Sequence, residues 1–123
     1  MKHHSPGFLS LVTQAKKQIK EITPQALKKL LDEKKIGYLI DVRESDELSS
    51  GRIPTAIHLG KGIIERDIEK QLPNLQQPVV VYCSGGFRCA LVAKNLQDMG
   101  YTDVSSLDTG LQGWIDAGYP IEK

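Results

Sequence analysis

The run VVVYCSGGFRC at residues 79–89 constrains the fold more than any other stretch of the sequence. Its first four residues are apolar and mostly β-branched, which predicts a short strand covered on both faces, as in a parallel sheet. The strand ends at Cys83, three small residues predict a loop, and Arg88 stands where a helical pattern begins. We therefore interpret Cys83 as a reactive thiol held between the end of a strand and the start of a helix.

The rest of the chain alternates helical and strand patterns. Apolar residues at helical spacing predict helices over residues 8–20, 24–35, 61–72, 89–100 and 110–117. Short strands are predicted over residues 38–42, within 51–59, and over 79–82 and 104–107; the stretches at 38–42 and 79–82 are nearly all apolar. This alternation predicts an α/β fold in which helices cover both faces of a mainly parallel sheet. The reactive site of such a sheet lies at the carboxyl ends of its strands, where Asp41, Arg43 and Cys83 stand.

Composition and charge exclude several classes of protein. The 123 residues suffice for one domain with its own core, and 16 basic against 15 acidic residues leave no net field that would attract nucleic acid or an anionic membrane. The longest apolar run has only the length of a strand, so no transmembrane segment is expected. Residues 1–7 are expected to be a disordered end rather than part of a signal peptide. Two cysteines without a disulfide framework favour a reducing compartment, and we expect a cytoplasmic protein.

The loop after Cys83 has the features that stabilise an anionic sulfur. A thiol attacks as the thiolate, and an unperturbed cysteine is mostly protonated at neutral pH. Residues 84–86 are small, so their main-chain N–H groups can turn inward as an anion nest at the positive end of the following helix. Arg88 adds a fixed positive charge that suits an oxyanion. A local hydrogen bond, rather than a part in catalysis, is expected of His58.

Four segments of the sequence resemble motifs of the rhodanese family of sulfurtransferases. They are CSGGFR at 83–88, DVR at 41–43, GRIPTAIH at 51–58, and TGLQGW with GYP at 109–114 and 118–120. The resemblance runs from about Ile22 to Ile121. It implies a rhodanese-like domain over residues 22–123, built on a five-stranded, mainly parallel sheet flanked by helices. Residues 1–21, a tail and an amphipathic helix, would lie outside it.

The resemblance further implies an enzyme of the thiosulfate sulfurtransferase type. Cys83 would take the sulfane sulfur of a donor such as thiosulfate, hold it as a persulfide, and pass it to a thiophilic acceptor, either cyanide or a thiol. The substrate-binding residues would be those of the loop, namely Ser84, Gly85, Gly86, Phe87 and Arg88. Asp41 and Arg43 would brace the loop from neighbouring strand ends. Donor and acceptor would be small molecules, or a protein persulfide and a protein thiol; no cofactor is required, and the cysteines and histidines are not spaced as metal ligands.

The number of residues between the cysteine and the arginine bears on the alternatives. Phosphatases and arsenate reductases of the same fold resemble this loop but carry five residues there. This chain carries four, and the shorter loop should fit a sulfur atom rather than a phosphate. A non-enzymatic persulfide carrier or protein-binding module is the other alternative. The physiological donor and acceptor, the role of the N-terminal helix and the oligomeric state are left open at this point.

Three residues near these motifs have more specific interpretations. Cys89 begins an apolar stripe that continues to Leu96, so we expect it to face the sheet as a small core residue. The alternative is a second thiol that resolves a Cys83 persulfide into a disulfide. The family often has serine at this position. Phe87 is interpreted either as a pocket wall or as a plug against the helix, and Trp114 as a core residue.

Overall fold

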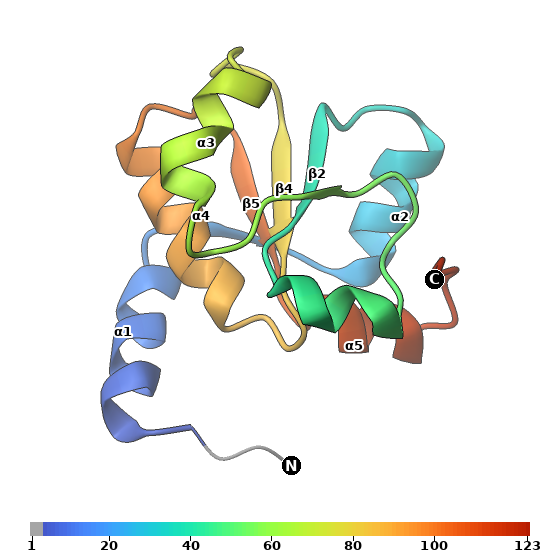
Figure 1. The fold of residues 1–123 in the computed structure, drawn as a ribbon, viewed down its shortest axis with the longest axis horizontal. Coiled ribbons are helices and arrows are strands. Elements are labelled where there is room, and N and C mark those ends of the chain that lie inside the picture. Colours follow the sequence, from blue (N-terminus) through green and yellow to red (C-terminus); the bar gives the residue numbers. More distant parts are fainter. Residues whose placement is uncertain (1–3) are drawn as a thin grey trace.

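Five parallel strands form the central sheet of the structure, a computed structural model that describes residues 4–123 (Figure 1). The strands are β1 (Lys20–Ile22), β2 (Tyr38–Asp41), β3 (Ile57–His58), β4 (Val79–Tyr82) and β5 (Val104–Leu107). Their order in the sheet is β1-β5-β4-β2-β3, and each neighbouring pair is parallel. The predicted α/β fold with a five-stranded parallel sheet is therefore confirmed.

Helices cover both faces of this sheet. They are α1 (Pro6–Lys16), α2 (Pro24–Asp32), α3 (Ile64–Gln71), α4 (Arg88–Asp98) and α5 (Gly110–Asp116), with a 3-10 helix, η1, at Ser45–Ser50. In Figure 1, α3 and α4 lie on one side of the sheet and α2 and α5 on the other, while α1 packs against α4. Within residues 4–123, no helix has both the length and the apolar character needed to cross a membrane.

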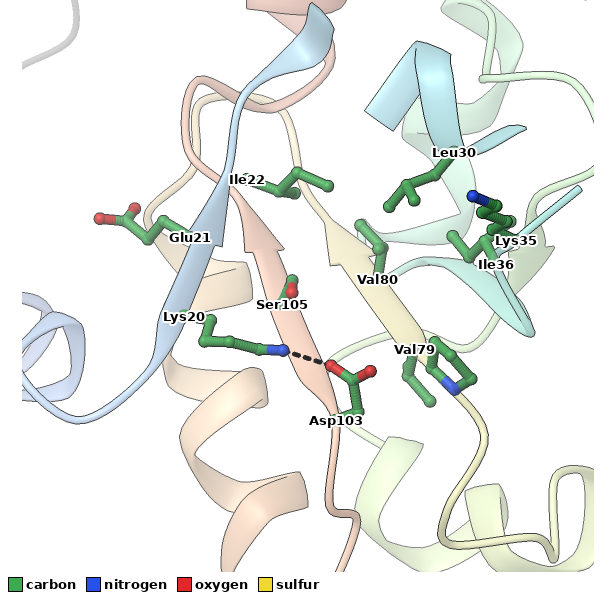
Figure 2. Close-up of a pocket in the computed structure, with 11 residues that line it drawn as sticks. Lys20, Glu21, Ile22, Leu30, Lys35, Ile36, Val79, Val80, Asp103 and Ser105 are labelled. Carbon is green, nitrogen blue, oxygen red and sulfur yellow. Dashed lines mark hydrogen bonds and ion pairs between the residues drawn. The ribbon is translucent and has the colours of Figure 1, made fainter. Parts of the chain in front are cut away.

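The segment after α1 differs from its prediction. The helix ends at Lys16 rather than near Lys20, and residues 20–22 form an edge strand in which Lys20 pairs with Ser105 of β5 (Figure 2). The side chains of this strand are mostly exposed, so no apolar alternation marks it in the sequence. The extended backbone depends instead on the partner strand, which is tertiary context that overrides local pattern.

The beginning of α1 also differs from its prediction. Ser5 is the N-cap residue, and its hydroxyl oxygen accepts a hydrogen bond from the main-chain N–H of Phe8 at 3.4 Å. Pro6 follows in the first turn, where a missing N–H leaves no helical bond unmade. The expectation of a disordered end over residues 1–7 is therefore wrong from Ser5 onward, and its first three residues lie outside the described range.

A cavity of about 420 Å³ opens beside α2 and β1 at the amino ends of the strands (Figure 2). Leu30 of α2 and Val80 of β4 line it, together with Lys20 and Asp103, which form an ion pair. Cys83 follows the carboxyl end of β4, so the cavity and Cys83 lie at opposite ends of the strands. It contributes no residue to the site described below.

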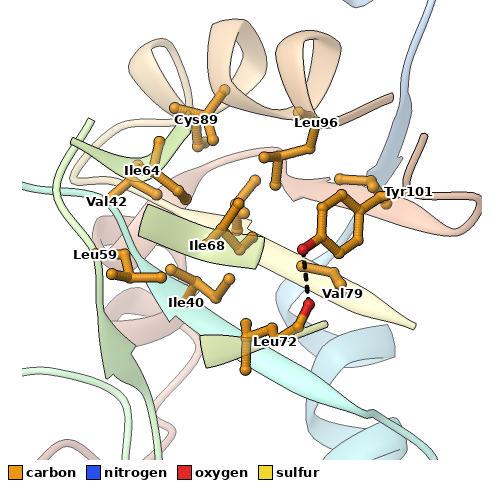
Figure 3. Close-up of a cluster of buried hydrophobic side chains, with 14 of the residues drawn as sticks. Ile40, Val42, Leu59, Ile64, Ile68, Leu72, Val79, Cys89, Leu96 and Tyr101 are labelled. Carbon is orange, nitrogen blue, oxygen red and sulfur yellow. Dashed lines mark hydrogen bonds between the residues drawn. The ribbon is translucent and has the colours of Figure 1, made fainter. Parts of the chain in front are cut away.

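Two apolar cores, one on each face, follow from the alternation of side chains along the strands. In β4, Val79 and Val81 belong to the core beneath α3 and α4, which Figure 3 shows. Val80 and Tyr82 point the other way, into the core beneath α2 and α5. Because β4 is buried on both faces, its sequence shows a continuous apolar run rather than an alternation.

The predicted apolar stripes of the helices are confirmed. Ile64 of α3 and Cys89 and Leu96 of α4 have no exposed surface and face the sheet (Figure 3). Trp114 of α5 is buried in the opposite core, and its ring N–H donates to the carbonyl oxygen of Pro120 at 2.7 Å. The prediction of Trp114 as a core residue is therefore confirmed.

Candidate active site

Cys83 lies directly after the carboxyl end of β4, the middle strand of the sheet, and is 1% exposed. The main chain turns through residues 84–87 and enters α4 at Arg88. The main-chain N–H groups of Gly86 and Cys89 donate to Sγ of Cys83 at 3.2 Å and 3.4 Å. One amide of the loop and one amide of the first helical turn therefore converge on the sulfur, at the positive end of α4.

A second thiol touches the first. The Sγ atoms of Cys83 and Cys89 lie 3.5 Å apart, and the hydroxyl of Ser106 on β5 lies 3.1 Å from Sγ of Cys89. Cys89 is also a fully buried core residue, as the apolar stripe predicted. The core position is therefore confirmed, and Cys89 also contacts Cys83, because the first turn of α4 lies over the sheet where the adjoining strand β4 ends. The alternative, a second thiol that resolves a Cys83 persulfide, stays a prediction.

The two thiols have opposite pKa shifts. The pKa of Cys83 is lowered to about 5, first by the hydrogen bond from the Cys89 thiol and then by main-chain N–H groups, including that of Gly86, against the opposing effect of burial. The pKa of Cys89 is raised well above its ordinary value by its contact with the Cys83 sulfur and by burial. At neutral pH the site therefore holds a Cys83 thiolate and a protonated Cys89. No histidine is needed as a base for this ionisation.

The connection between β5 and α5 holds the loop in place. Gly86 has φ +92°, and a Cβ atom there would lie 2.1 Å from the carbonyl oxygen of Asp108. Gly110 has φ +65°, and a Cβ atom there would lie 2.7 Å from the carbonyl oxygen of Cys83. The Leu111 N–H donates to that same oxygen at 2.8 Å. Only residues without a side chain allow this close approach. In the sequence, the glycines of the CSGGFR and TGLQGW segments are its signals.

Arg88 binds a partner that sequence reasoning missed. Its guanidinium donates two hydrogen bonds to the carboxylate of Glu47 in η1, both at 2.9 Å, and a third to the hydroxyl of Ser84 at 3.1 Å. This pairing lowers the pKa of Glu47 to about 2. Arg88 thus connects the loop to η1. Both of its terminal nitrogens already donate hydrogen bonds within the protein, to Glu47 and Ser84. No local pattern marks Glu47, which lies 41 positions earlier in the chain.

Asp41 and Arg43 form a buried ion pair that contacts the segment carrying Glu47, the partner of Arg88. The Arg43 guanidinium contacts the Asp41 carboxylate at 2.8 to 3.1 Å, and both side chains are almost wholly buried. Arg43 also donates to the carbonyl oxygens of Gly51 at 2.7 Å and Glu47 at 3.2 Å. The pair therefore holds the segment that presents Glu47, and Glu47 in turn contacts Arg88 at the end of the loop. His58 contacts the carbonyl oxygen of Arg43 at 2.7 Å, which is the local hydrogen bond expected of it.

Phe87 joins the loop to the N-terminal helix. Its ring centroid lies 4.5 Å from that of His4 and 6.3 Å from that of Phe8, and the Lys16 ammonium lies 5.5 Å from it. Of the two interpretations of Phe87, packing against a helix fits these contacts, although the helix is α1 rather than α4. The N-terminal helix therefore borders the candidate site.

Residues 23–117, which carry the whole site apart from α1, match the family model described as Rhodanese-like domain. The chain belongs to the rhodanese family. This rhodanese chain is 35% identical over 99 residues to YtwF of Bacillus subtilis (strain 168), a match that covers 79% of the chain and 91% of YtwF. It is 33% identical over 105 residues to the thiosulfate sulfurtransferase GlpE of Pseudomonas savastanoi pv. phaseolicola, with 85% and 94% covered.

A solved structure matches the rhodanese chain along nearly its whole length. It is RPA3614 of Rhodopseudomonas palustris CGA009, a protein of unknown function described as a possible tyrosine phosphatase. The TM-score is 0.84 at 30% identity, and the match covers 99% of this chain and 98% of that one. Taken together, these matches confirm the resemblance noted from the four motifs and place the chain among rhodanese-like sulfurtransferases.

Proposed function

We propose that this protein is a sulfurtransferase that carries a sulfane sulfur on Cys83 as a persulfide, from a donor such as thiosulfate to a thiophilic acceptor, either cyanide or a thiol. One observation carries the proposal. The Cys83 sulfur has three hydrogen-bond donors directed at it, the N–H groups of Gly86 and Cys89 and the Cys89 thiol, and its pKa is about 5. A sulfur in this environment is a thiolate at neutral pH and a ready nucleophile.

The reaction consists of two displacements. The Cys83 thiolate attacks the outer sulfur of thiosulfate. The bond between the two sulfur atoms of thiosulfate breaks, and sulfite leaves with the bonding electron pair. The negative charge then resides on the outer sulfur of the persulfide. Cyanide attacks that sulfur and leaves as thiocyanate, which returns the thiolate. This is covalent catalysis of the ping-pong type, and the amide donors stabilise the anion in both resting states.

The remaining residues receive supporting roles in this proposal. Residues 84–87 line the approach to the sulfur. Arg88 attracts an anionic donor by its positive charge and also holds Glu47 through two hydrogen bonds. Asp41 and Arg43 act at a distance, by holding the segment that presents Glu47. The loop itself carries no lysine and only one arginine, so a persulfide is a better donor than thiosulfate in this proposal.

A phosphatase is the second candidate, because RPA3614 is described as a possible tyrosine phosphatase. One feature of this chain disfavours it, because four residues rather than five separate Cys83 from Arg88 and the shorter loop should fit a sulfur atom rather than a phosphate. Hydrolysis of an aryl phosphate, without any sulfur transfer, would favour this candidate.

The test measures both displacements. With thiosulfate alone, the purified protein should release one equivalent of sulfite per chain in a burst; with cyanide added, it should form thiocyanate with parallel double-reciprocal plots. Cys83→Ser should abolish the burst and the turnover. A burst of sulfite without turnover on any acceptor would instead indicate a non-enzymatic carrier. The absence of both reactions with thiosulfate and with glutathione persulfide would contradict the proposal.

A further inference from the structure

Cys83 and Cys89 have the arrangement of a dithiol pair. Both are free thiols, and their sulfur atoms already lie 3.5 Å apart. A disulfide bond is about 2.05 Å long, so the two atoms need to approach by only about 1.5 Å.

The two thiols are also chemically unequal. Cys83 is held as the thiolate by amide donors, whereas Cys89 is kept protonated and is fixed by the Ser106 hydroxyl at 3.1 Å. Once Cys83 carries an added sulfur, the negative charge lies on that outer sulfur, which can take the proton of Cys89 and leave Cys89 as the attacking thiolate. Cys83 and Cys89 belong to the same buried core cluster, in which Figure 3 shows Cys89 on the helix that faces the sheet. Cys89 therefore contacts the very sulfur atom to which the outer sulfur of the persulfide is bonded.

We propose that Cys89 resolves the Cys83 persulfide, so that the protein has a second activity, the release of hydrosulfide from sulfane-sulfur donors. This inference rests on the sulfur transfer proposed above. The charged outer sulfur of the persulfide first takes the thiol proton of Cys89. The Cys89 thiolate then attacks Sγ of Cys83, the bond from Sγ of Cys83 to the outer sulfur breaks, and the outer sulfur leaves with that electron pair as HS⁻. The two cysteine sulfurs are oxidised to a disulfide while the sulfane sulfur is reduced, so no external oxidant is needed.

The disulfide has to be reduced before another cycle. A dithiol is the suitable reductant, because it opens a disulfide through a mixed disulfide and then closes on itself. The same persulfide therefore has two outcomes. An external acceptor takes the sulfur intact, whereas in the absence of an acceptor Cys89 converts it to hydrosulfide and a dithiol completes the cycle. Serine, which the family often has at this position, would allow only the first outcome.

The test compares the wild-type protein with Cys89→Ser, which keeps a hydrogen-bond donor beside Cys83 but no second thiol. Each is reduced, freed of reductant, mixed with one equivalent of thiosulfate, quenched in acid, and measured by intact mass and by a sulfide assay. The wild type should lose about 2 Da as a Cys83–Cys89 disulfide forms, and release close to one equivalent of sulfide. The variant should gain about 32 Da, the mass of one added sulfur, and release less than about a tenth as much sulfide.

Each other outcome overturns the inference. A wild type that keeps the added sulfur and releases no sulfide shows that Cys89 does not resolve it, while sulfur transfer itself stands. Equal sulfide release by Cys89→Ser shows that release does not need the second thiol. If neither protein is loaded by thiosulfate or by glutathione persulfide, the proposed function fails and this inference fails with it.

Discussion

Replacing Cys89 with alanine removes the hydrogen bond that does most to lower the pKa of Cys83. A hydrogen bond to a charged group contributes about 1.5–3 kcal/mol, and one pKa unit corresponds to about 1.4 kcal/mol. The pKa of Cys83, about 5 in the intact site, should therefore rise to roughly 6 to 7 in Cys89→Ala. Cys89→Ser retains an O–H donor at the same place and should stay near the wild-type value.

The assay follows alkylation of Cys83 by iodoacetamide as a function of pH, with intact mass as the readout. Only the thiolate reacts, so the rate rises through the pKa and is constant above it. Near pH 5.5 the alanine variant should react roughly tenfold more slowly than the wild type, and above pH 8 the two rates should converge. The measurement uses no sulfur donor and is independent of the proposed reaction.

Two results would refute this reasoning. Identical midpoints for the wild type and Cys89→Ala would mean that the main-chain amides of Gly86 and Cys89 are sufficient to hold the thiolate. A wild-type midpoint above pH 8 would mean that burial outweighs all the donors at Cys83. Urea unfolding of each variant serves as the control, because a loosened core would change the exposure of the sulfur as well as its pKa.

Three further substitutions test the support around the loop. Gly86→Ala forces a side chain into the +92° conformation and against a main-chain carbonyl, and should lower the free energy of unfolding by at least about 2 kcal/mol in urea titration; an unchanged midpoint would contradict the close approach. Arg43→Met leaves the Asp41 carboxylate buried without its partner and should destabilise the fold by about 3–5 kcal/mol, whereas the double variant with Asp41→Asn should recover part of the loss. Glu47 has its pKa lowered from 4.5 to about 2 by Arg88, so its contribution to stability is present above pH 4.5 and disappears as the pH falls toward 2. Glu47→Gln should therefore be less stable than the wild type at pH 7 but approach it near pH 2, and a constant difference across that range would exclude the ion pair as the cause.

Much of the fold could be predicted because it depends on local pattern. The predicted strands at 79–82 and 104–107 agree residue for residue with β4 and β5. A continuous apolar run marks β4 in the sequence, whereas β5, VSSL, is marked by its place between two helical patterns. The start of α2 also depends on a local signal, because Thr23 directly precedes Pro24 and its hydroxyl accepts a hydrogen bond from the Ala26 N–H at 3.1 Å. Strand β1 could not be predicted, because its three residues are polar or half-exposed and are extended only through pairing with β5.

The candidate site likewise has one part that could be predicted from the sequence and another that could not. Cys83 and the loop after it were predictable, since a strand end, small residues and a helix start follow one another directly in the chain. The partners of the loop were not. Glu47 reaches Arg88 across 41 positions, and Ser106 reaches Cys89 across 17. Their contacts depend on which strands become neighbours in the sheet.

By itself, the sequence determined that this chain would place one nucleophilic thiol, followed by a flexible amide-rich turn and a helix start, at the carboxyl edge of a parallel sheet. Only the tertiary structure decided what that thiol meets there. Periodicity indicates that Cys89 faces inward, but the distance from Cys89 to Cys83 depends on how α4 lies over β4 and β5. That packing turned a core cysteine into the hydrogen-bond donor of the nucleophile, because side chains on one face of a helix and residues at a strand end meet only when the two elements are packed together.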